Sequence, residues 1–407
     1  MSRTQTLRTR RDFLEARGVL LVTRDPPPPP PAASGQPPII PGNPAEGVEI
    51  LLSVWDDGQV IALNGHVDLG TGIRTALAQI VAEELDVPMS RVQVVLGDTA
   101  RAPNQGPTIA SASIQIHSAP LRQAAAQARD FLVGRAAEKM GVAANTLSTR
   151  DGVIRGGASD DGATLSYAEL LRGERVELRL DPSANIKPVE DYRVVGQSVP
   201  RVDIPAKVAG ELVFVHDMRV PGMLHGRVVR PPYAGADHGE FIGNSLESVD
   251  ETSIAHIPGV RAVVVIRDFV GVVAEREEHA EQAAAALRVR WKPWPGMPAL
   301  GDLAQALRAN PAIQRRLVDE GDVDAALAGV AQPMARTYVW PYQMHASIGP
   351  SCAVAHWQGE SAQPHALSVW AGTQNPHALR ADLSRLLGVS DVTIDVVRME
   401  AAGCYGR

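Results

Sequence analysis

Cysteine is scarce in this chain, and its scarcity excludes several kinds of site. Only two of the 407 residues are cysteines, Cys352 and Cys404. Two cysteines cannot form a disulfide framework, and their separation matches no zinc or iron–sulfur spacing. The eleven histidines include no HExxH motif or other tight ligand cluster, which favours structural or surface roles for them. If the protein carries out redox chemistry, its iron–sulfur centres therefore lie on another chain.

Long apolar runs and basic stripes are also absent. No run of about eighteen apolar residues occurs, so the sequence predicts no membrane-spanning helix. The formal net charge of −7 is spread along the chain, which argues against nucleic acid as a partner. Glycine and proline are abundant, with 36 and 31 residues, as expected of a globular protein rich in turns. The length indicates two or three domains.

Residues 1–45 are predicted to form a leader and a proline-rich linker. Arg10-Arg11 looks like a twin-arginine export motif, but the apolar stretch Gly18–Val22 that follows is short for a signal peptide. Two interpretations stay open, a periplasmic protein with a working signal and a cytoplasmic protein whose surface helix ends in a linker. Pro26–Pro31 is a run of six prolines, which forms a stiff polyproline II spacer.

Residues 46–185 are predicted to form a mixed module of strands packed on helices. An Asp-Asp-Gly turn at 56–58 between two apolar stretches is a hairpin signal. Apolar residues at helical spacing predict a helix over Ile73–Leu85, which Pro88 ends. The other expected elements are strands over Val48–Val54, Val60–Leu63 and Val92–Leu96, and a second helix over about Pro120–Lys139.

Two further units are predicted beyond this module. Residues 190–295 are rich in strands, and residues 336–407 form a third unit after a connecting segment at 296–335. In the second unit we expect strands over Leu212–Val215, Leu224–Arg230, Val260–Ile266 and Arg288–Trp291 and a helix over Ala280–Leu287. In the third we expect strands over Thr337–Trp340, Ser351–Trp357, Leu367–Trp370 and Val392–Val397 and a helix over Pro376–Leu387.

A glycine-rich turn, Gly65–Gly72, leads into the first predicted helix. It is not a P-loop, because Thr71 stands where the lysine after the second glycine would be. The dinucleotide fingerprint fails as well, since Thr75 occupies its third glycine position. What remains is a tight turn at a helix N-terminus. Such a turn either presents backbone N–H groups to an anion or has a purely structural role.

Three other segments are candidate ligand loops. Pro107–Ser113 is a run of small and hydroxyl residues, which either admits a ligand to the backbone or is simply a solvated loop. Gln374 stands at a strand–helix corner, where Asn375 can cap the helix and Pro376 takes its first position. Gly403–Gly406 is a second glycine turn able to donate backbone hydrogen bonds.

In this order the segments resemble the large molybdenum-cofactor-binding subunits of the xanthine dehydrogenase and aldehyde oxidase family. Gly65–Thr75 resembles the family's Met-Gly-Gln-Gly segment, and Pro107–Ser113 its Pro-Thr-Ala-Ala-Ser-x-Ser loop. Arg201-x-Asp203-x-Pro205-Ala206-Lys207-Val208-x-Gly210 is similar to the start of the hammerhead domain, and Gly403–Gly406 to the Gly-Gly-Phe-Gly segment. The early position of the first segment is typical of bacterial nicotinate- and isoquinoline-type dehydrogenases.

The resemblance implies an α+β fold, with a molybdenum-cofactor-binding module, a hammerhead α/β domain and the start of a second cofactor-binding domain. It implies a cofactor-binding set and no direct protein ligand to the metal. That set is Gly70, Thr71, Gly72, Thr108, Ala110, Ser111, Ser113, Gln374, Gly403, Tyr405 and Gly406. Thr71 replaces the family's glutamine, while Cys404 and Tyr405 replace Gly and Phe of the metal loop. The general-base glutamate is expected beyond Arg407, so no catalytic residue is identifiable.

The implied activity is hydroxylation of an N-heteroaromatic or aldehyde substrate with water-derived oxygen. The implied cofactor is a molybdenum-molybdopterin in its cytosine dinucleotide form. Electrons would pass to 2Fe–2S clusters on a small partner subunit and then to a cytochrome c or flavin acceptor. A chain that ends in a glycine turn is expected to be truncated and inactive alone. The alternative is a non-catalytic scaffold or assembly partner of the same fold, and nucleotide binding is disfavoured by the missing lysine.

Overall fold

A computed structural model describes residues 7, 9–26, 48–156, 162–233, 243–294, 301–309, 311–341, 343–358 and 367–405. The chain divides into two compact units, one made of Met1–Met218 with His345–Arg407 and the other of Arg219–Met344. Helices and strands are mixed in both units, so the predicted α+β class is confirmed. No helix in the described part of the chain is long and apolar enough to cross a membrane.

A five-stranded sheet organises the first unit. Its order is β4-β3-β2-β1-β8. The pairs β1–β2 and β2–β3 are antiparallel, whereas β1–β8 and β3–β4 are parallel. The strands are β1 (Val19–Arg24), β2 (Glu49–Trp55), β3 (Val60–Asn64), β4 (Val92–Leu96) and β8 (Arg175–Arg179). The hairpin predicted around residues 56–58 is β2–β3 and is confirmed.

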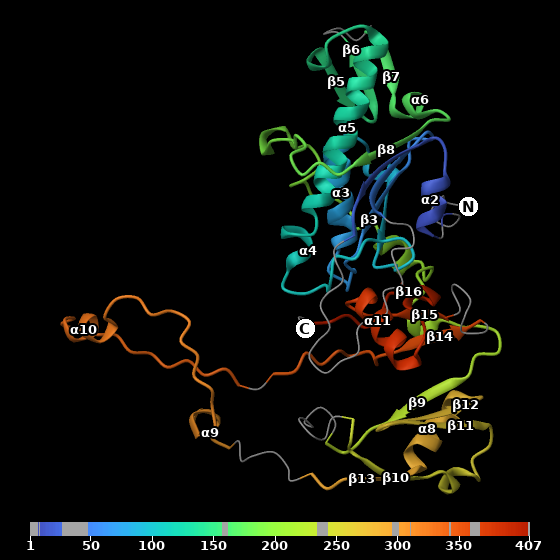
Figure 1. Cartoon of the computed structure of the whole chain (residues 1–407), viewed down its shortest axis with the longest axis vertical. Helices are drawn as coiled ribbons and strands as arrows, with labels where there is room; N and C mark the ends of the chain where they lie inside the picture. Colours follow the sequence, from blue (N-terminus) through green and yellow to red (C-terminus); the bar gives the residue numbers. More distant parts are fainter. Residues whose placement is uncertain are drawn as a thin grey trace. The chain divides into compact units, whose positions relative to one another are not determined.

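Helices cover both faces of this sheet (Figure 1). On one face, α3 (Ile73–Leu85) and α5 (Ala119–Met140) pack in the main apolar core, so both predicted helices are confirmed. On the other face, Phe13 of α2 (Arg10–Glu15) packs on Trp55, with ring centroids 6.2 Å apart. The sheet is therefore apolar on both sides, as expected for a layer between two layers of helices.

Residues 9–24, which fall within the expected leader, form a capped helix and a strand of the first unit. Thr9 and Asp12 form a capping box for α2, and β1 lies between β2 and β8 with five of its six residues buried. The short apolar stretch is thus a central strand whose side chains face the core on both sides. Residues 27–47, which hold most of the expected proline linker, lie outside the described residues.

Replacing Thr9 by alanine is expected to lower the free energy of unfolding by about 1 kcal/mol, because the capping box loses its acceptor. Thermal or urea unfolding would measure the change. Thr9→Ser, which keeps the hydroxyl, should remain near the parent value. Equal stabilities for the two variants would contradict a folded role for this segment.

Smaller elements complete the first unit. A short sheet holds β5 (Leu147–Arg150), β6 (Val153–Gly156) and β7 (Thr164–Ser166), with α6 (Tyr167–Leu171) beside it. The C-terminal sheet has the order β14-β15-β16, with β14 (Ala353–Trp357), β15 (Leu367–Ala371), β16 (Ile394–Arg398) and α11 (Pro376–Leu387). The three strands and the helix predicted here are confirmed. The short helices are α4 (Ala112–Gln115) and α7 (Ile204–Val208) and 3₁₀ turns at Met89–Arg91, Ala144–Thr146, Val189–Asp191, Val215–Asp217 and Asp391–Thr393.

The second unit has a three-stranded sheet of order β11-β12-β9 and the pair β10–β13. Its strands are β9 (His225–Val229), β10 (Leu246–Asp250), β11 (Val260–Ile266), β12 (Phe269–Ala274) and β13 (Arg288–Trp291). Its helices are α8 (Glu277–Ala286), α9 (Leu303–Ala309), α10 (Val323–Ala328) and a 3₁₀ turn at Glu251–Ile254. The predictions for β9, β11, β13 and α8 are confirmed within a few residues.

Two predicted strands were wrong, and the boundaries of the units differ from the predicted ones. Leu212–Val215 forms only an isolated bridge from Phe214 to Glu400, and Thr337–Trp340 has no strand partner among the described residues. Tyr338 and Trp340 are 74% and 76% exposed, so these side chains belong to no buried face of a sheet. Residues 190–218, expected with the second unit, belong to the first. Of the expected third unit, residues 336–344 belong to the second unit and residues 345–407 to the first.

Candidate functional site

The glycine turn is organised from inside by Asp68. This side chain is 3% exposed and accepts the backbone N–H groups of Gly70 (2.9 Å), Gly72 (3.1 Å) and Arg74 (3.1 Å). Burial alone would raise the pKa of Asp68, but these three donors and the charge of Arg398 hold it below its ordinary value. Asp68 is thus a built-in anion that accepts from the Gly70 and Gly72 N–H groups, so these two donors are directed at Asp68.

An ion-pair cluster holds the same turn from outside. Arg201 donates from Nη1 to the Gly70 carbonyl oxygen at 2.9 Å and binds Asp203 through Nε and Nη2 at 3.0 and 2.7 Å. Lys207 donates to Asp203 at 2.6 Å, and these donors hold the pKa of Asp203 well below its ordinary value against the effect of burial. Between the contacts of Asp68 and those of Arg201, Gly70 and Gly72 have φ of +94° and +84°, and Thr71 is exposed.

The small-residue loop is fastened to the start of this turn. The Val67 N–H donates to Thr108 Oγ1 at 2.9 Å, and the His66 ring Nδ1 lies 2.7 Å from Ser113 Oγ. Further along, Asn64 Nδ2 and Gln105 Nε2 both donate to the His117 carbonyl oxygen at 3.0 Å. The Gly65 N–H donates to Gln105 Oε1 at 2.8 Å. The loop from 105 to 117 therefore takes its position from residues 64–67.

The same loop meets the predicted strand–helix corner. The Thr108 N–H donates to the Gln374 carbonyl oxygen at 2.9 Å, and Gln374 Nε2 donates back to the Thr108 carbonyl oxygen at 3.0 Å. Asn375 caps α11 by accepting from the Ala378 N–H, as the sequence predicted.

The middle of the loop is exposed and backbone-strained. Ala110 and Ser111 have φ of +54° and +55°, a conformation that costs non-glycine residues about 1–2 kcal/mol each. Both side chains are small and exposed, so the backbone here is open to a ligand. Ser113 differs, because it is 8% exposed and its hydroxyl is turned toward His66. The prediction that Ser113 donates to a ligand is therefore not supported.

The C-terminal glycine turn approaches the same place. A Cβ at Gly403, where φ is +85°, would lie 3.1 Å from the Leu69 carbonyl oxygen, and Ser347 Oγ donates to the Gly403 carbonyl oxygen at 3.2 Å. Tyr405 is 55% exposed, and Gly406 lies outside the described residues. The turn at 65–72 thus contacts both Thr108 and Gly403, and the predicted segments are brought together.

A second charged group joins these elements. Glu400, which is 8% exposed, accepts two hydrogen bonds from Arg398 at 2.5 and 3.0 Å and one from Arg74 at 3.3 Å. Cations outnumber anions by one among the described charges around the turn, namely Arg74, Arg201, Lys207 and Arg398 against Asp68, Asp203 and Glu400. The excess charge favours an anionic ligand near these loops.

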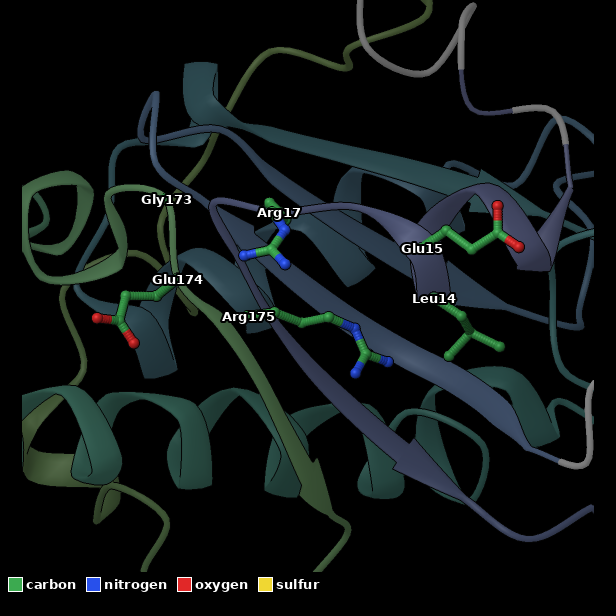
Figure 2. A pocket seen from close by; sticks show the side chains of 6 residues that line it. All are labelled: Leu14, Glu15, Arg17, Gly173, Glu174 and Arg175. Atoms are coloured by element: carbon green, nitrogen blue, oxygen red, sulfur yellow. The ribbon is translucent and has the colours of Figure 1, made fainter.

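Two cavities of the first unit do not include the predicted residues. One, of about 580 Å³, is lined by Leu14, Glu15, Arg17, Gly173, Glu174 and Arg175 (Figure 2). Its Glu174 pairs with Arg135 and its Arg175 with Glu177, so these charges are balanced by neighbours. Another, of about 430 Å³, is lined by residues of β4 and β16 with Arg74. In the described part of the chain, no group of three His, Cys, Asp or Glu is placed to hold a metal ion.

Sequence reasoning missed the residues that hold the loops. Asp68 and His66 were read only as parts of a glycine turn, and Asn64, Gln105 and His117 were not singled out. An aspartate two residues before Gly70 is a signal for a local turn, since Asp side chains accept from backbone N–H groups just beyond them. Nothing in the sequence marks His66, because its partner Ser113 is distant along the chain.

Acid is expected to destabilise the protein through its histidines. Burial and the nearby His117 lower the pKa of His66 from 6.5 to about 4, and burial lowers that of His377 to about 3. Between these values and 6.5 the unfolded chain binds protons that the folded chain does not, so stability falls as pH falls through this window. Urea unfolding at pH values from about 7 to 5 would measure the loss, and His66→Phe should reduce its slope. A stability that stays flat over this range would contradict the prediction.

Two protein-family models match this chain. Residues 33–199 and 308–407 each match a molybdopterin cofactor-binding domain model. These two matches identify the chain as a member of the molybdopterin cofactor-binding family, and the relatives described next agree with this.

The chain is 59% identical over 359 residues to the B subunit of nicotinate dehydrogenase from Pseudomonas putida, an alignment covering 88% of this chain and 30% of the relative. It is 29% identical over 421 residues to the beta subunit of isoquinoline 1-oxidoreductase from Brevundimonas diminuta, covering 90% and 52% of the two chains. The chain thus spans about a third to a half of these relatives. The crystal structure of quinoline 2-oxidoreductase from Pseudomonas putida 86 matches with a TM-score of 0.39 and 18% identity, over 51% of this chain and 30% of that one.

Proposed function

We propose that this chain forms part of the cofactor-binding core of a molybdenum hydroxylase that oxidises an N-heteroaromatic substrate, nicotinate-like or isoquinoline-like, or an aldehyde. One observation carries the proposal. Thr108 and Gln374 are joined by two reciprocal hydrogen bonds although 266 residues separate them along the chain. This pair couples the small-residue loop to the strand–helix corner beside the turn at 65–72. The family relationship supports the same cofactor.

Most of the assembled residues suit a molybdopterin. Ala110 and Ser111 expose backbone beside Thr108, and Gln374 offers an amide at a fixed corner. The excess positive charge around the turn suits the phosphate of the cofactor. The Gly70 and Gly72 N–H groups do not fit, because Asp68 accepts them. We therefore assign cofactor contacts to Thr71, Thr108, Ala110, Ser111, Gln374, Gly403, Tyr405 and Gly406, and a structural role to Gly70, Gly72 and Ser113.

When bound, the cofactor supplies a metal centre that activates oxygen derived from water and takes up the electrons removed from the substrate. The residues of this chain would position it. Gln374 would present its amide at the corner that Thr108 fixes, and the turn at Gly403 would present backbone next to Leu69. The proton acceptor, a glutamate by family resemblance, is proposed to lie outside these residues.

The finer assignments are also proposals. We propose the cytosine dinucleotide form of the cofactor and a small 2Fe–2S partner subunit that passes electrons to a cytochrome c or a flavin. The names of both relatives, which are subunits of dehydrogenases or oxidoreductases, support a partner. Because Arg10 and Arg11 begin a helix that packs on the central sheet, we propose that they act in the fold, which favours the cytoplasmic alternative.

The test is the metal and nucleotide content of the native complex that contains this chain. We expect molybdenum close to one atom per chain, cytidine monophosphate after acid hydrolysis, and reduction of an acceptor dye with nicotinate, isoquinoline or an aldehyde. Gln374→Ala should lower molybdenum content several-fold, whereas Gln358→Ala, which removes an exposed amide, should leave it unchanged. A complex without molybdenum would favour the scaffold alternative.

A further inference from the structure

His66 is a buried histidine with one specific partner. It is fully buried, and its Nδ1 lies 2.7 Å from Ser113 Oγ. Its ring packs on the His117 ring, with centroids 4.1 Å apart. Its Nε2 makes no hydrogen bond of normal geometry with a described residue, although the backbone of Gln105 is close enough to raise the pKa of His66. Loss of the hydrogen bond between His66 Nδ1 and Ser113 Oγ would leave Nδ1 unsatisfied in the interior, in addition to Nε2. This cost favours the position of Ser113 in which the bond is made.

Two consecutive residues hold the two ends of the exposed loop. Val67 binds the Thr108 end through its backbone N–H, and His66 binds the Ser113 end through its side chain. Between these ends lie Ala110 and Ser111, both in the left-handed backbone region. Non-glycine residues leave this conformation unless their surroundings hold it. The two clamps are therefore suited to maintain it.

The clamp at the Thr108 end is shared with Gln374. At the other end His66 binds the Ser113 side chain, while Asn64 and Gln105 hold the His117 carbonyl oxygen four residues further on. Ala112 and Ser113 are the buried residues of the short helix α4, so a displaced Ser113 would carry this helix with it. Loss of the His66 bond is thus expected to loosen the loop from the α4 side and leave the Thr108–Gln374 pair in place.

We infer that His66 is a positioning residue for the cofactor loop. It holds Ser113, keeps Ala110 and Ser111 in their left-handed conformation, and so presents the exposed backbone of the loop beside Gln374. The part of this inference that concerns the cofactor rests on the proposed function. The part that concerns the loop rests on the contacts of His66 alone.

Hydrogen–deuterium exchange of the 407-residue chain tests the loop directly. His66→Phe keeps an aromatic ring for His117 and removes the hydrogen-bonding nitrogen. Amides of residues 109–117 should exchange about tenfold faster, the factor expected for loss of one buried hydrogen bond. Amides of α3 and of the β2–β3 hairpin should keep their parent rates. Ser113→Ala, a smaller change, should give the same increase, and the double variant should add nothing to it.

Two controls separate this role from general destabilisation. His279→Phe alters another histidine with a buried, unpartnered nitrogen, in the second unit, and should leave exchange at 109–117 unchanged. Ser113→Thr keeps the hydroxyl and should restore slow exchange. Unchanged loop exchange in both His66→Phe and Ser113→Ala would overturn the inference, as would faster exchange throughout the first unit at the same ratio.

Molybdenum content of the complete complex tests the link to the cofactor. His66→Phe should lower it several-fold while Gln358→Ala does not. Faster loop exchange with full molybdenum content would overturn the cofactor role of His66 and leave the proposed function intact. Absence of molybdenum from the parent complex would overturn the proposed function, while the exchange result would still decide whether His66 holds the loop.

Discussion

Replacing Glu83 by alanine is expected to lower the free energy of unfolding by about 3–5 kcal/mol, the range for removing one partner of a buried charged network. Glu83 is 2% exposed, and its Oε2 accepts the consecutive N–H groups of Arg193 (2.8 Å), Val194 (2.6 Å) and Val195 (2.9 Å). Lys187 Nζ lies 3.5 Å from Oε1. Alanine would leave three backbone donors without this acceptor at once.

The charge state of Glu83 supports this estimate. Burial would raise its pKa, but the three N–H donors and Lys187 together hold it below the ordinary value, so the side chain is ionised at neutral pH. Bonds to an ionised acceptor are stronger than neutral ones. The network ties residues 187–195 to α3, so its loss should release that segment first.

Urea unfolding would measure the effect, with Glu138→Ala as the matched control. Glu138 is an exposed glutamate of α5, and its removal should change stability by no more than about 0.5 kcal/mol. Glu83→Gln should fall between the two, because an amide oxygen still accepts but carries no charge. A Glu83→Ala loss below about 1 kcal/mol would show that the three donors find water or other acceptors.

The elements that could be predicted are those with local signals. Helix α3 begins and ends where expected, because its apolar spacing, its preceding glycine turn and Pro88 all lie within a few residues of it. Strand β1 was missed because its neighbours β2 and β8 are supplied by distant parts of the chain. Thr337–Trp340 has the composition of a strand, but no partner pairs with it among the described residues.

At the candidate site, too, the local segments could be predicted from the sequence and the contacts between distant residues could not. The segments could be named because glycine, small and hydroxyl residues recur in a recognisable order. Their mutual contacts could not be predicted, since Thr108 pairs with Gln374, between β15 and α11, and Ser113 pairs with His66 of the first turn. Whether the turn binds an anion depends on a residue much closer in the sequence. Asp68, inside the motif itself, supplies the negative charge that a ligand was expected to bring.

Replacing Gly65 by alanine is expected to damage both the fold and the site. A Cβ there would lie 2.1 Å from the Pro103 carbonyl oxygen and 2.9 Å from the Gln105 backbone nitrogen. Both are backbone atoms, so no side-chain rotation can relieve the contact. Overpacking of this kind costs about 1–3 kcal/mol, and the Gly65–Gln105 hydrogen bond of 2.8 Å would be strained as well.

The consequence for function follows from where Gly65 lies. It separates Asn64 from His66 and Val67, which hold the loop from 105 to 117, so a displaced backbone shifts every clamp together. We therefore expect Gly65→Ala to lower molybdenum retention in the native complex further than its loss of stability alone would.

Gly134→Ala is the matched control, because Gly134 lies in α5 with nothing within 4 Å of the added Cβ. It should raise stability by about 0.5–1 kcal/mol through helix propensity and leave molybdenum content unchanged. If Gly65→Ala had the same stability and molybdenum content as Gly134→Ala, the close approach of residues 65 and 103 would not determine the position of the loop from 105 to 117.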